Sequence, residues 1–310
     1  MVHQTDTETI LVHSPPLSVK ERIERFRHQE ALPEYWAQDA LRWFLPLSND
    51  IADRCATSHF LCIGINGAQG TGKSTLAKLL VMLLKEQHQI NAVAMSLDDF
   101  YYSHQERQHL ARTVHPLLAT RGVPGTHDVD LALDTVQRLR AGESVRLPRF
   151  DKATDDCVPR SDWQYSPAHT DVLILEGWCI GIPAQSSEQL PKPVNELEAV
   201  EDPDGHWRRY VNDSLAGRYQ ALFEQLNLLI MLQAPAFESI FDWRLLQEEK
   251  LRASLPPGET LRVMNASQIR RFIAHYERLT RHALRVLPAR ADVVFTLNNL
   301  HRVVAESASQ

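Results

Sequence analysis

The sequence has few cysteines and no long apolar run. Its four cysteines (Cys55, Cys62, Cys157 and Cys179) are scattered through 310 residues without a CxxC pair or a metal-ligand spacing. This pattern favours free thiols in a reducing compartment. No stretch approaches the roughly 20 apolar residues of a membrane-spanning helix, and the first 18 residues lack the basic and apolar regions of a signal peptide. We therefore expect a cytoplasmic protein with no membrane partner.

An excess of positive charge is also absent. The net charge is -6 and the pI about 6.2, which argues against a nucleic-acid partner bound by bulk charge. Hydrophobic residues make up 44% and charged residues 23%, as in ordinary globular proteins. The length suffices for one large domain or two small ones. The sequence does not predict an oligomeric state.

Residues 1–55 are expected to form a tail followed by a helical extension. Val19, Ile23 and Phe26 lie at helical spacing, and the aromatic-rich segment 36–44 continues the pattern. Packing against the main domain is the natural use of so many aromatic side chains, although a partner-binding arm would show the same pattern.

Residues 56–310 alternate between apolar strands and amphipathic helices. This alternation predicts an α/β fold with a doubly wound, mainly parallel, five-stranded sheet. The segment near 183–206 is rich in Pro, Glu and Asn and is expected to be an irregular insertion. The expected strands are 60–65, 92–97, 171–178, 226–235 and 292–297, and the expected helices are 71–87, 128–142, 237–254 and 266–286.

The strongest motif is "GAQGTGKS" at 67–74, which matches G-x-x-x-x-G-K-[ST]. In such a P-loop the backbone N–H groups surround the phosphates of ATP, Lys73 reaches the β- and γ-phosphates, and the Ser74 hydroxyl binds Mg²⁺. A glycine-rich turn could match by chance, but an apolar strand precedes this one and a helix follows it. The predicted cofactor-binding residues are Gly67, Ala68, Gln69, Gly70, Thr71, Gly72, Lys73, Ser74 and Thr75.

Acidic residues follow two other expected strands. Glu176 closes "VLILE" and is expected to join Ser74 at the metal. Asp98 and Asp99 follow the strand at 92–97, where a carboxylate beside a phosphate site can accept the proton of an attacking hydroxyl. We expect Asp98 to be this base and Asp99 a metal ligand or orienting group. Both could instead be turn or capping residues.

Several stretches together resemble the P-loop kinases of small metabolites, which include uridine kinase, phosphoribulokinase and bacterial-type pantothenate kinase. These stretches are "GINGAQGTGKST", "SLDDFY", "HPLLATRGVPGTHD", "LPRFDKATDD" and "LILEGWCIG", and "RGVPGTHD" with "EGW" most resembles the D-glycerate 3-kinase group. The resemblance implies transfer of the γ-phosphoryl group of ATP, with Mg²⁺, to a hydroxyl. It also implies that Asp98 activates the acceptor, and that the helix near 237–254 is a lid with an arginine that closes over the phosphates. Arg244 fits this role best and Arg252 is a second candidate, although Arg244 could also be a solvated helix residue.

The acceptor side is rich in cations, which favours an anionic hydroxy acid such as glycerate as the small-molecule acceptor. Asp128 could equally be a helix cap, and His127 a satisfied loop histidine. The family's "FDKS" ends here in Ala153, so the hydrogen bond of that serine is absent. The predicted acceptor-binding residues are Arg121, Thr126, His127, Asp128, Lys152, Arg160 and Trp178.

Two rival functions remain open. The same chemistry could act on a nucleoside, pantothenate or a sugar phosphate. A non-catalytic ATP-binding switch would keep the P-loop, but it would have little need for Asp98 or for a full acceptor loop.

Overall fold

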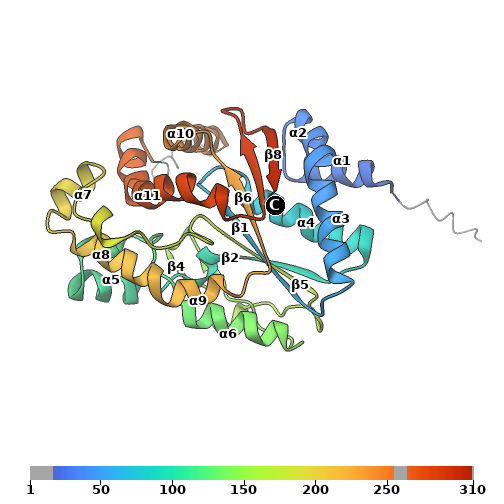
Figure 1. Ribbon diagram of the computed structural model, residues 1–310, viewed down its shortest axis with the longest axis horizontal. Helices are drawn as coiled ribbons and strands as arrows, with labels where there is room; N and C mark the ends of the chain where they lie inside the picture. The colour runs from blue at the N-terminus through green and yellow to red at the C-terminus, as the bar shows by residue number, and fades with distance from the viewer. Residues whose placement is uncertain (1–16, 255–263, 309–310) are drawn as a thin grey trace, which may run out of the picture.

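A six-stranded sheet forms the centre of the computed structural model, which describes residues 17–254 and 264–308 (Figure 1). Five strands are parallel, which confirms the predicted mainly parallel α/β sheet. The strand order is β2 (Ala92–Ser96), β5 (Val172–Gly177), β1 (Leu61–Gly67), β6 (Leu228–Gln233), β7 (Val293–Leu297) and β8 (Val303–Ala308).

The predicted number of five strands is wrong, because β8 adds an antiparallel sixth strand at the edge beside β7. Only Val303 of β8 is buried, and the five residues after it are exposed. An edge strand of this kind lacks the continuous apolar run that marks a strand buried on both faces. Its sequence therefore did not predict a strand.

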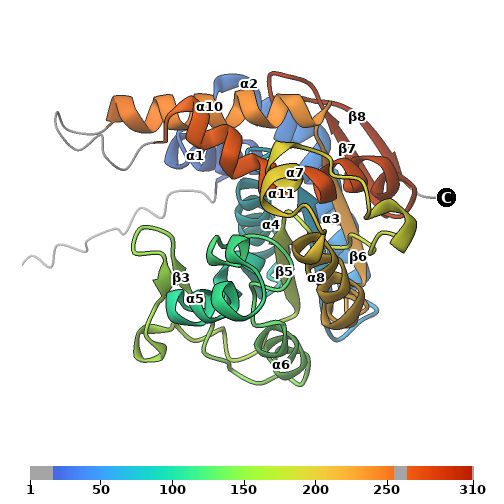
Figure 2. The same ribbon diagram turned by 90° about the vertical axis from the view of Figure 1, so that its left-hand side faces the viewer.

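Helices cover both faces of the sheet, and Figure 2 shows α10 and the small β3–β4 hairpin projecting on the same side of it. The helices α4, α6, α10 and α11 correspond to the four predicted ones, whereas α5, α8 and α9 were not predicted. The bounds are α1 Val19–Gln29, α2 Glu34–Asp39, α3 Leu45–Cys55, α4 Lys73–His88, α5 His104–Thr113, α6 Val129–Arg140, α7 Glu196–Glu201, α8 His206–Ser214, α9 Gln220–Phe223, α10 Phe237–Ser254 and α11 Ala266–Val286; the hairpin strands are β3 Phe150–Asp151 and β4 Asp156–Cys157.

The N-terminal helices α1 to α3 share a hydrophobic core with α4 and one face of the sheet. The ring of Phe44 meets the ring of Phe295 on β7 edge-on, with centroids 5.4 Å apart. On the opposite face, a second core joins the sheet to α6, α8, α9 and α11. The extension thus packs against the sheet through its aromatic residues, as apolar burial favours.

The segment 183–206 is less irregular than expected, because it contains a short 3₁₀ helix (Ser187–Gln189) and α7. Two buried ion pairs anchor it: Arg278 to Glu198 at 2.6 Å, and Arg208 to Asp202 at 2.9 Å. These paired charges hold a segment whose sequence has little apolar periodicity. No helix in the described ranges is long and apolar enough to cross a membrane.

Candidate active site

The P-loop connects the end of β1 to the start of α4. Gly70 (φ +84°) and Gly72 (φ +93°) have the left-handed backbone conformation that favours glycine. The Thr71 hydroxyl donates to the carbonyl of Ala68 at 2.8 Å, and the Lys73 ammonium donates to the same oxygen at 3.2 Å. The loop is therefore preformed, and the N-terminal end of α4, with Lys73, Ser74 and Thr75 in its first turn, faces it.

Glu176 lies beside the P-loop because β5 pairs with both β1 and β2. The Ser74 hydroxyl donates to Glu176 Oε1 at 2.6 Å, and Glu176 is only 7% exposed. A hydroxyl and a carboxylate are the hard oxygen ligands that suit Mg²⁺, which usually takes few protein ligands and completes its shell with phosphate and water. The described residues contain no group of three or more His, Cys, Asp or Glu side chains placed to hold a metal, which is compatible with such a sparse set.

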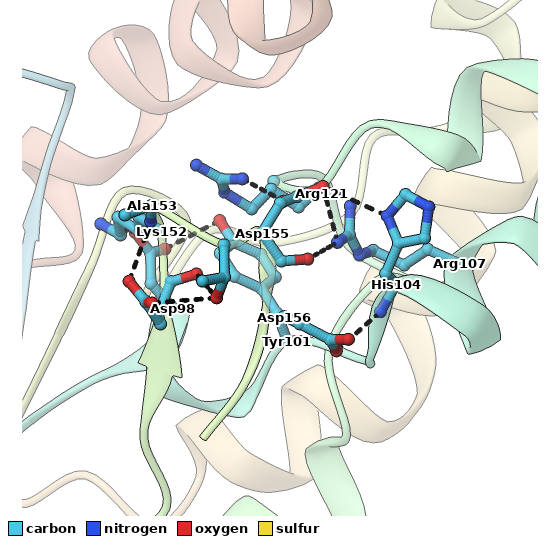
Figure 3. A network of polar contacts seen from close by, with 12 residues as sticks. Asp98, Tyr101, His104, Arg107, Arg121, Lys152, Ala153, Asp155 and Asp156 are labelled. Atoms are coloured by element: carbon cyan, nitrogen blue, oxygen red, sulfur yellow. Dashed lines mark hydrogen bonds and ion pairs between the residues drawn. The ribbon is translucent and has the colours of Figure 1, made fainter. Parts of the chain in front are cut away.

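Asp98 lies in the short 3₁₀ helix Leu97–Phe100 that follows β2, with β5 between it and the P-loop strand. Its Oδ1 accepts a hydrogen bond from the Tyr101 hydroxyl at 2.8 Å, and its Oδ2 accepts one from the Lys152 ammonium at 2.6 Å (Figure 3). Burial raises the pKa of Asp98, but the charge of Lys152 and these hydrogen bonds outweigh it and leave the pKa below its ordinary value. Asp98 is therefore an ionised carboxylate at neutral pH.

Asp99 makes the contacts of a turn residue. Its carboxylate accepts from the backbone N–H of Ser96 at 3.1 Å, in a capping box, and from that of Phe150 at 3.5 Å. Burial raises its pKa. A metal-binding role for Asp99 stays a prediction, because its hydrogen bonds are with the backbone and its one ion-pair partner among the described residues is Arg149, at 3.9 Å.

Three predicted acceptor residues lie inside the "RGVPGTHD" loop or beneath it. Thr126 is fully buried and its hydroxyl donates to the carbonyl of Val123 at 2.7 Å. Asp128 accepts from the N–H of Leu131 at 2.9 Å as the N-cap of α6. Trp178 is 5% exposed, and its indole N–H donates to the carbonyl of Gly122 at 2.8 Å. These hydrogen bonds shape the loop. Direct binding of an acceptor by these three residues stays a prediction.

His127 is buried against Tyr101, with the two rings stacked 4.4 Å apart. Its Nδ1 lies 2.7 Å from the hydroxyl of Tyr219, a residue that the sequence did not single out. The same hydroxyl accepts from the N–H of Gly125 at 3.0 Å, so its proton is free for Nδ1. Burial lowers the pKa of His127 to about 4. The imidazole is neutral at pH 7.

Arg121 is held by Asp155 at the tip of the β3–β4 hairpin, an ion pair visible in Figure 3. Asp155 also pairs with Arg107 at 3.0 Å. Arg107 is 1% exposed and donates to the carbonyls of Tyr102, Ala119 and Asp155. It therefore joins three separate segments of the acceptor side, yet no sequence motif marks it.

Arg160 lies just after the β3–β4 hairpin and lines a cavity with Asp99 and Asp128, whereas Arg244 lies much further along the chain. Arg160 stacks over the ring of Trp163 at 5.4 Å. Arg244 belongs to α10, pairs with Glu248 one turn along the helix and lies 5.8 Å from the ring centroid of Phe272. Its neighbour Trp243 contacts the P-loop: a Cβ built on Gly70 would lie 3.2 Å from the Cβ of Trp243. Helix α10 therefore lies against the phosphate loop through Trp243, and its role as a lid stays a prediction.

A P-loop whose serine hydroxyl is paired with a buried glutamate, together with an ionised aspartate two strands away, is typical of a P-loop phosphotransferase. The family model described as "Phosphoribulokinase / Uridine kinase family" matches residues 62–183. An uncharacterised kinase of Schizosaccharomyces pombe is 33% identical over 69% of this chain and 77% of its own length. The chain therefore belongs to the phosphoribulokinase/uridine kinase family of P-loop kinases.

Two further relatives carry a more specific name. The chloroplastic D-glycerate 3-kinase of Arabidopsis thaliana is 29% identical over 70% of this chain, and the match spans 46% of that longer protein. A solved D-glycerate 3-kinase from Cryptococcus neoformans covers 86% of this chain and 96% of its own, with a TM-score of 0.69 and 24% identity. At that identity the structural likeness supports the fold alone.

Proposed function

We propose that this kinase transfers the γ-phosphoryl group of ATP to a hydroxyl of D-glycerate, giving 3-phosphoglycerate. The observation that carries the proposal is the pairing of Asp98 with Lys152, which puts a base and a cation side by side. A hydroxy acid needs both, since one group accepts the hydroxyl proton while the other binds the carboxylate. The similarity in sequence to the chloroplastic D-glycerate 3-kinase of Arabidopsis thaliana supports this acceptor.

In this proposal Lys73 and Arg244 neutralise charge on the transferring phosphoryl group, and Asp98 accepts the proton of the attacking hydroxyl. Ser74 and Glu176 would hold Mg²⁺, whose contribution is to neutralise the charge of the phosphates. Arg121 and Lys152 would bind the acceptor carboxylate.

The main alternative is the same reaction on a nucleoside, pantothenate or a sugar phosphate. Nucleoside recognition calls for aromatic side chains that can stack on a base. Tyr101, which donates to Asp98, and Trp178, which donates to the acceptor loop, are each only 5% exposed and so offer little ring surface for stacking. The side chains of Lys152 and Arg121 are more accessible, at 60% and 26% exposed, and these two cations favour an anionic acceptor.

Acceptor-dependent ADP release tests the proposal. The assay uses Mg·ATP with D-glycerate, L-glycerate, uridine, pantothenate or ribulose 5-phosphate in separate reactions. We expect turnover with D-glycerate. Turnover with another compound instead would overturn the assigned acceptor, and ATP binding without turnover on any of them would favour the switch function.

A further inference from the structure

The β3–β4 hairpin lies over the acceptor side, and its Lys152 contacts Asp98. Lys152 lies in the turn between β3 and β4, and its side chain is 60% exposed. Asp98 is only 24% exposed. Figure 3 shows the ammonium group of Lys152 pointing at the carboxylate of Asp98 from this turn. The contact is therefore made by a side chain at the surface with a base at the edge of the core.

Both oxygens of Asp98 are occupied in this arrangement. Tyr101 donates to Oδ1 at 2.8 Å from beneath, and Lys152 donates to Oδ2 at 2.6 Å from the solvent side. An attacking hydroxyl must approach the carboxylate from the side that Lys152 covers, because Tyr101 is buried. A carboxylate that already binds an ammonium group is also a weaker base toward a neutral O–H donor.

The rest of the hairpin is held firmly, so the blocking contact depends on the Lys152 side chain. Buried Arg107 donates to the carbonyl of Asp155 at 2.7 Å, and the Thr154 hydroxyl donates to Asp151 Oδ2 at 2.9 Å within the turn. A lysine side chain on this frame can leave Asp98 by rotating its own bonds. An anionic acceptor would supply a second carboxylate for it.

We propose that Lys152 is a gate on Asp98: without acceptor it covers the base and suppresses hydrolysis of ATP by water, and with acceptor it moves to the substrate carboxylate. The inference rests on the proposed function, since it takes Asp98 as the base and an anionic acceptor as the substrate. It adds a specificity rule. Acceptors without a negative charge leave the gate on Asp98 and are poor substrates.

The suppressed side reaction is ATP hydrolysis. The oxygen of a water molecule forms a bond to the γ-phosphorus, the bond from that phosphorus to the bridging oxygen of ADP breaks, and the proton of the water passes to Asp98. This reaction needs only ATP, water and an uncovered carboxylate. Its rate without acceptor therefore reports whether Asp98 is covered.

The test is the acceptor-free ATPase rate of Lys152→Met. We expect this rate to rise about tenfold over wild type, a fraction of the full contribution of a general base. We also expect KM for D-glycerate to rise roughly tenfold to a hundredfold because a charge-assisted hydrogen bond is lost, with KM for ATP unchanged. Lys152→Arg should have an acceptor-free ATPase rate close to that of wild type. The double variant Asp98→Asn/Lys152→Met should not show the increased ATPase rate of Lys152→Met.

Arg149→Met is the matched control. Arg149 immediately precedes the same hairpin, is 65% exposed and lies 3.9 Å from Asp99. Its substitution therefore removes one positive charge near the site and leaves the contact between Lys152 and Asp98 in place. Its acceptor-free ATPase rate should equal that of wild type. Thermal unfolding of each variant checks that the fold is retained.

Two results would overturn the gate: an ATPase rate in Lys152→Met that is unchanged or lower, or an equal rise in Arg149→Met. The acceptor-free assay requires no knowledge of the acceptor. A wild type that ignores D-glycerate would therefore refute the proposed acceptor while the ATPase comparison still decides the gate.

Discussion

The phosphate side and the acceptor side of this active site are built in different ways. Nine consecutive residues, 67–75, form the phosphate side, and its shape comes from backbone geometry and the start of one helix. The acceptor side draws on the segments 96–102, 119–128 and 150–157, joined by side chains such as Arg107. A local motif therefore specifies the phosphate side, whereas the acceptor side depends on tertiary contacts.

The largest expected effects separate the two sides by chemistry. Asp98→Asn should lower kcat roughly 10²- to 10⁴-fold, because the base is lost, while ATP affinity stays close to wild type. Lys73→Met should weaken ATP binding as well as turnover, because in the proposed function its ammonium binds the phosphates. Steady-state kinetics with nucleotide titration calorimetry measures both. Near-normal turnover of Asp98→Asn would contradict the role of Asp98 as the base.

Arg107→Met tests whether one buried side chain holds the acceptor side together. Three carbonyl oxygens lose their donor and Asp155 loses one of its two arginine partners, so we expect the free energy of unfolding to fall by about 2 to 4 kcal/mol. KM for the acceptor should rise, and KM for ATP should not. Urea denaturation and kinetics give the two readouts. The exposed Arg112 on the same helix offers a control, since Arg112→Met should leave both unchanged.

The pH dependence of stability tests the burial of His127, again on the acceptor side. Burial lowers the pKa of His127 from 6.5 to about 4, so between these values the unfolded chain binds a proton that the native protein does not. The stabilisation is complete above pH 6.5 and is lost as pH falls toward 4, by up to about 3 kcal/mol. Urea denaturation at pH 7.5 and pH 5 should show a smaller loss in His127→Asn than in wild type. An equal loss in both proteins would contradict the burial of a neutral imidazole.

The smallest expected effect concerns the phosphate side. Gly70→Ala places a side chain on a left-handed backbone at a cost of about 1 to 2 kcal/mol, and its Cβ would lie 3.2 Å from the Cβ of Trp243 on α10. We expect weaker ATP binding with no separate effect on acceptor KM. Gly142→Ala has the same backbone strain but only the Nδ1 of His169 nearby, at 3.7 Å. It should lower stability and leave KM for ATP unchanged.

The same contrast explains what the sequence could predict. Buried parallel strands, α4 and the P-loop carry local signals, and the predicted α/β fold with a mainly parallel sheet was confirmed. The strand β8 was missed because its side chains are mostly exposed. Arg107, Asp155 and Tyr219 were missed because their importance arises from residues 12 to 94 positions away in the chain. Asp128 shows the reverse case, since its capping interaction is local and was foreseen as an alternative.

Direct detection of the product tests the central claim, that an ionised Asp98 beside Lys152 serves a hydroxy acid. A ³¹P NMR spectrum of the protein with Mg·ATP and D-glycerate should show ADP and a phosphomonoester coupled to a CH₂ group, as in 3-phosphoglycerate, and neither should accumulate with Asp98→Asn. A spectrum in which ATP stays intact with D-glycerate, or in which Asp98→Asn forms product at the wild-type rate, would contradict the account.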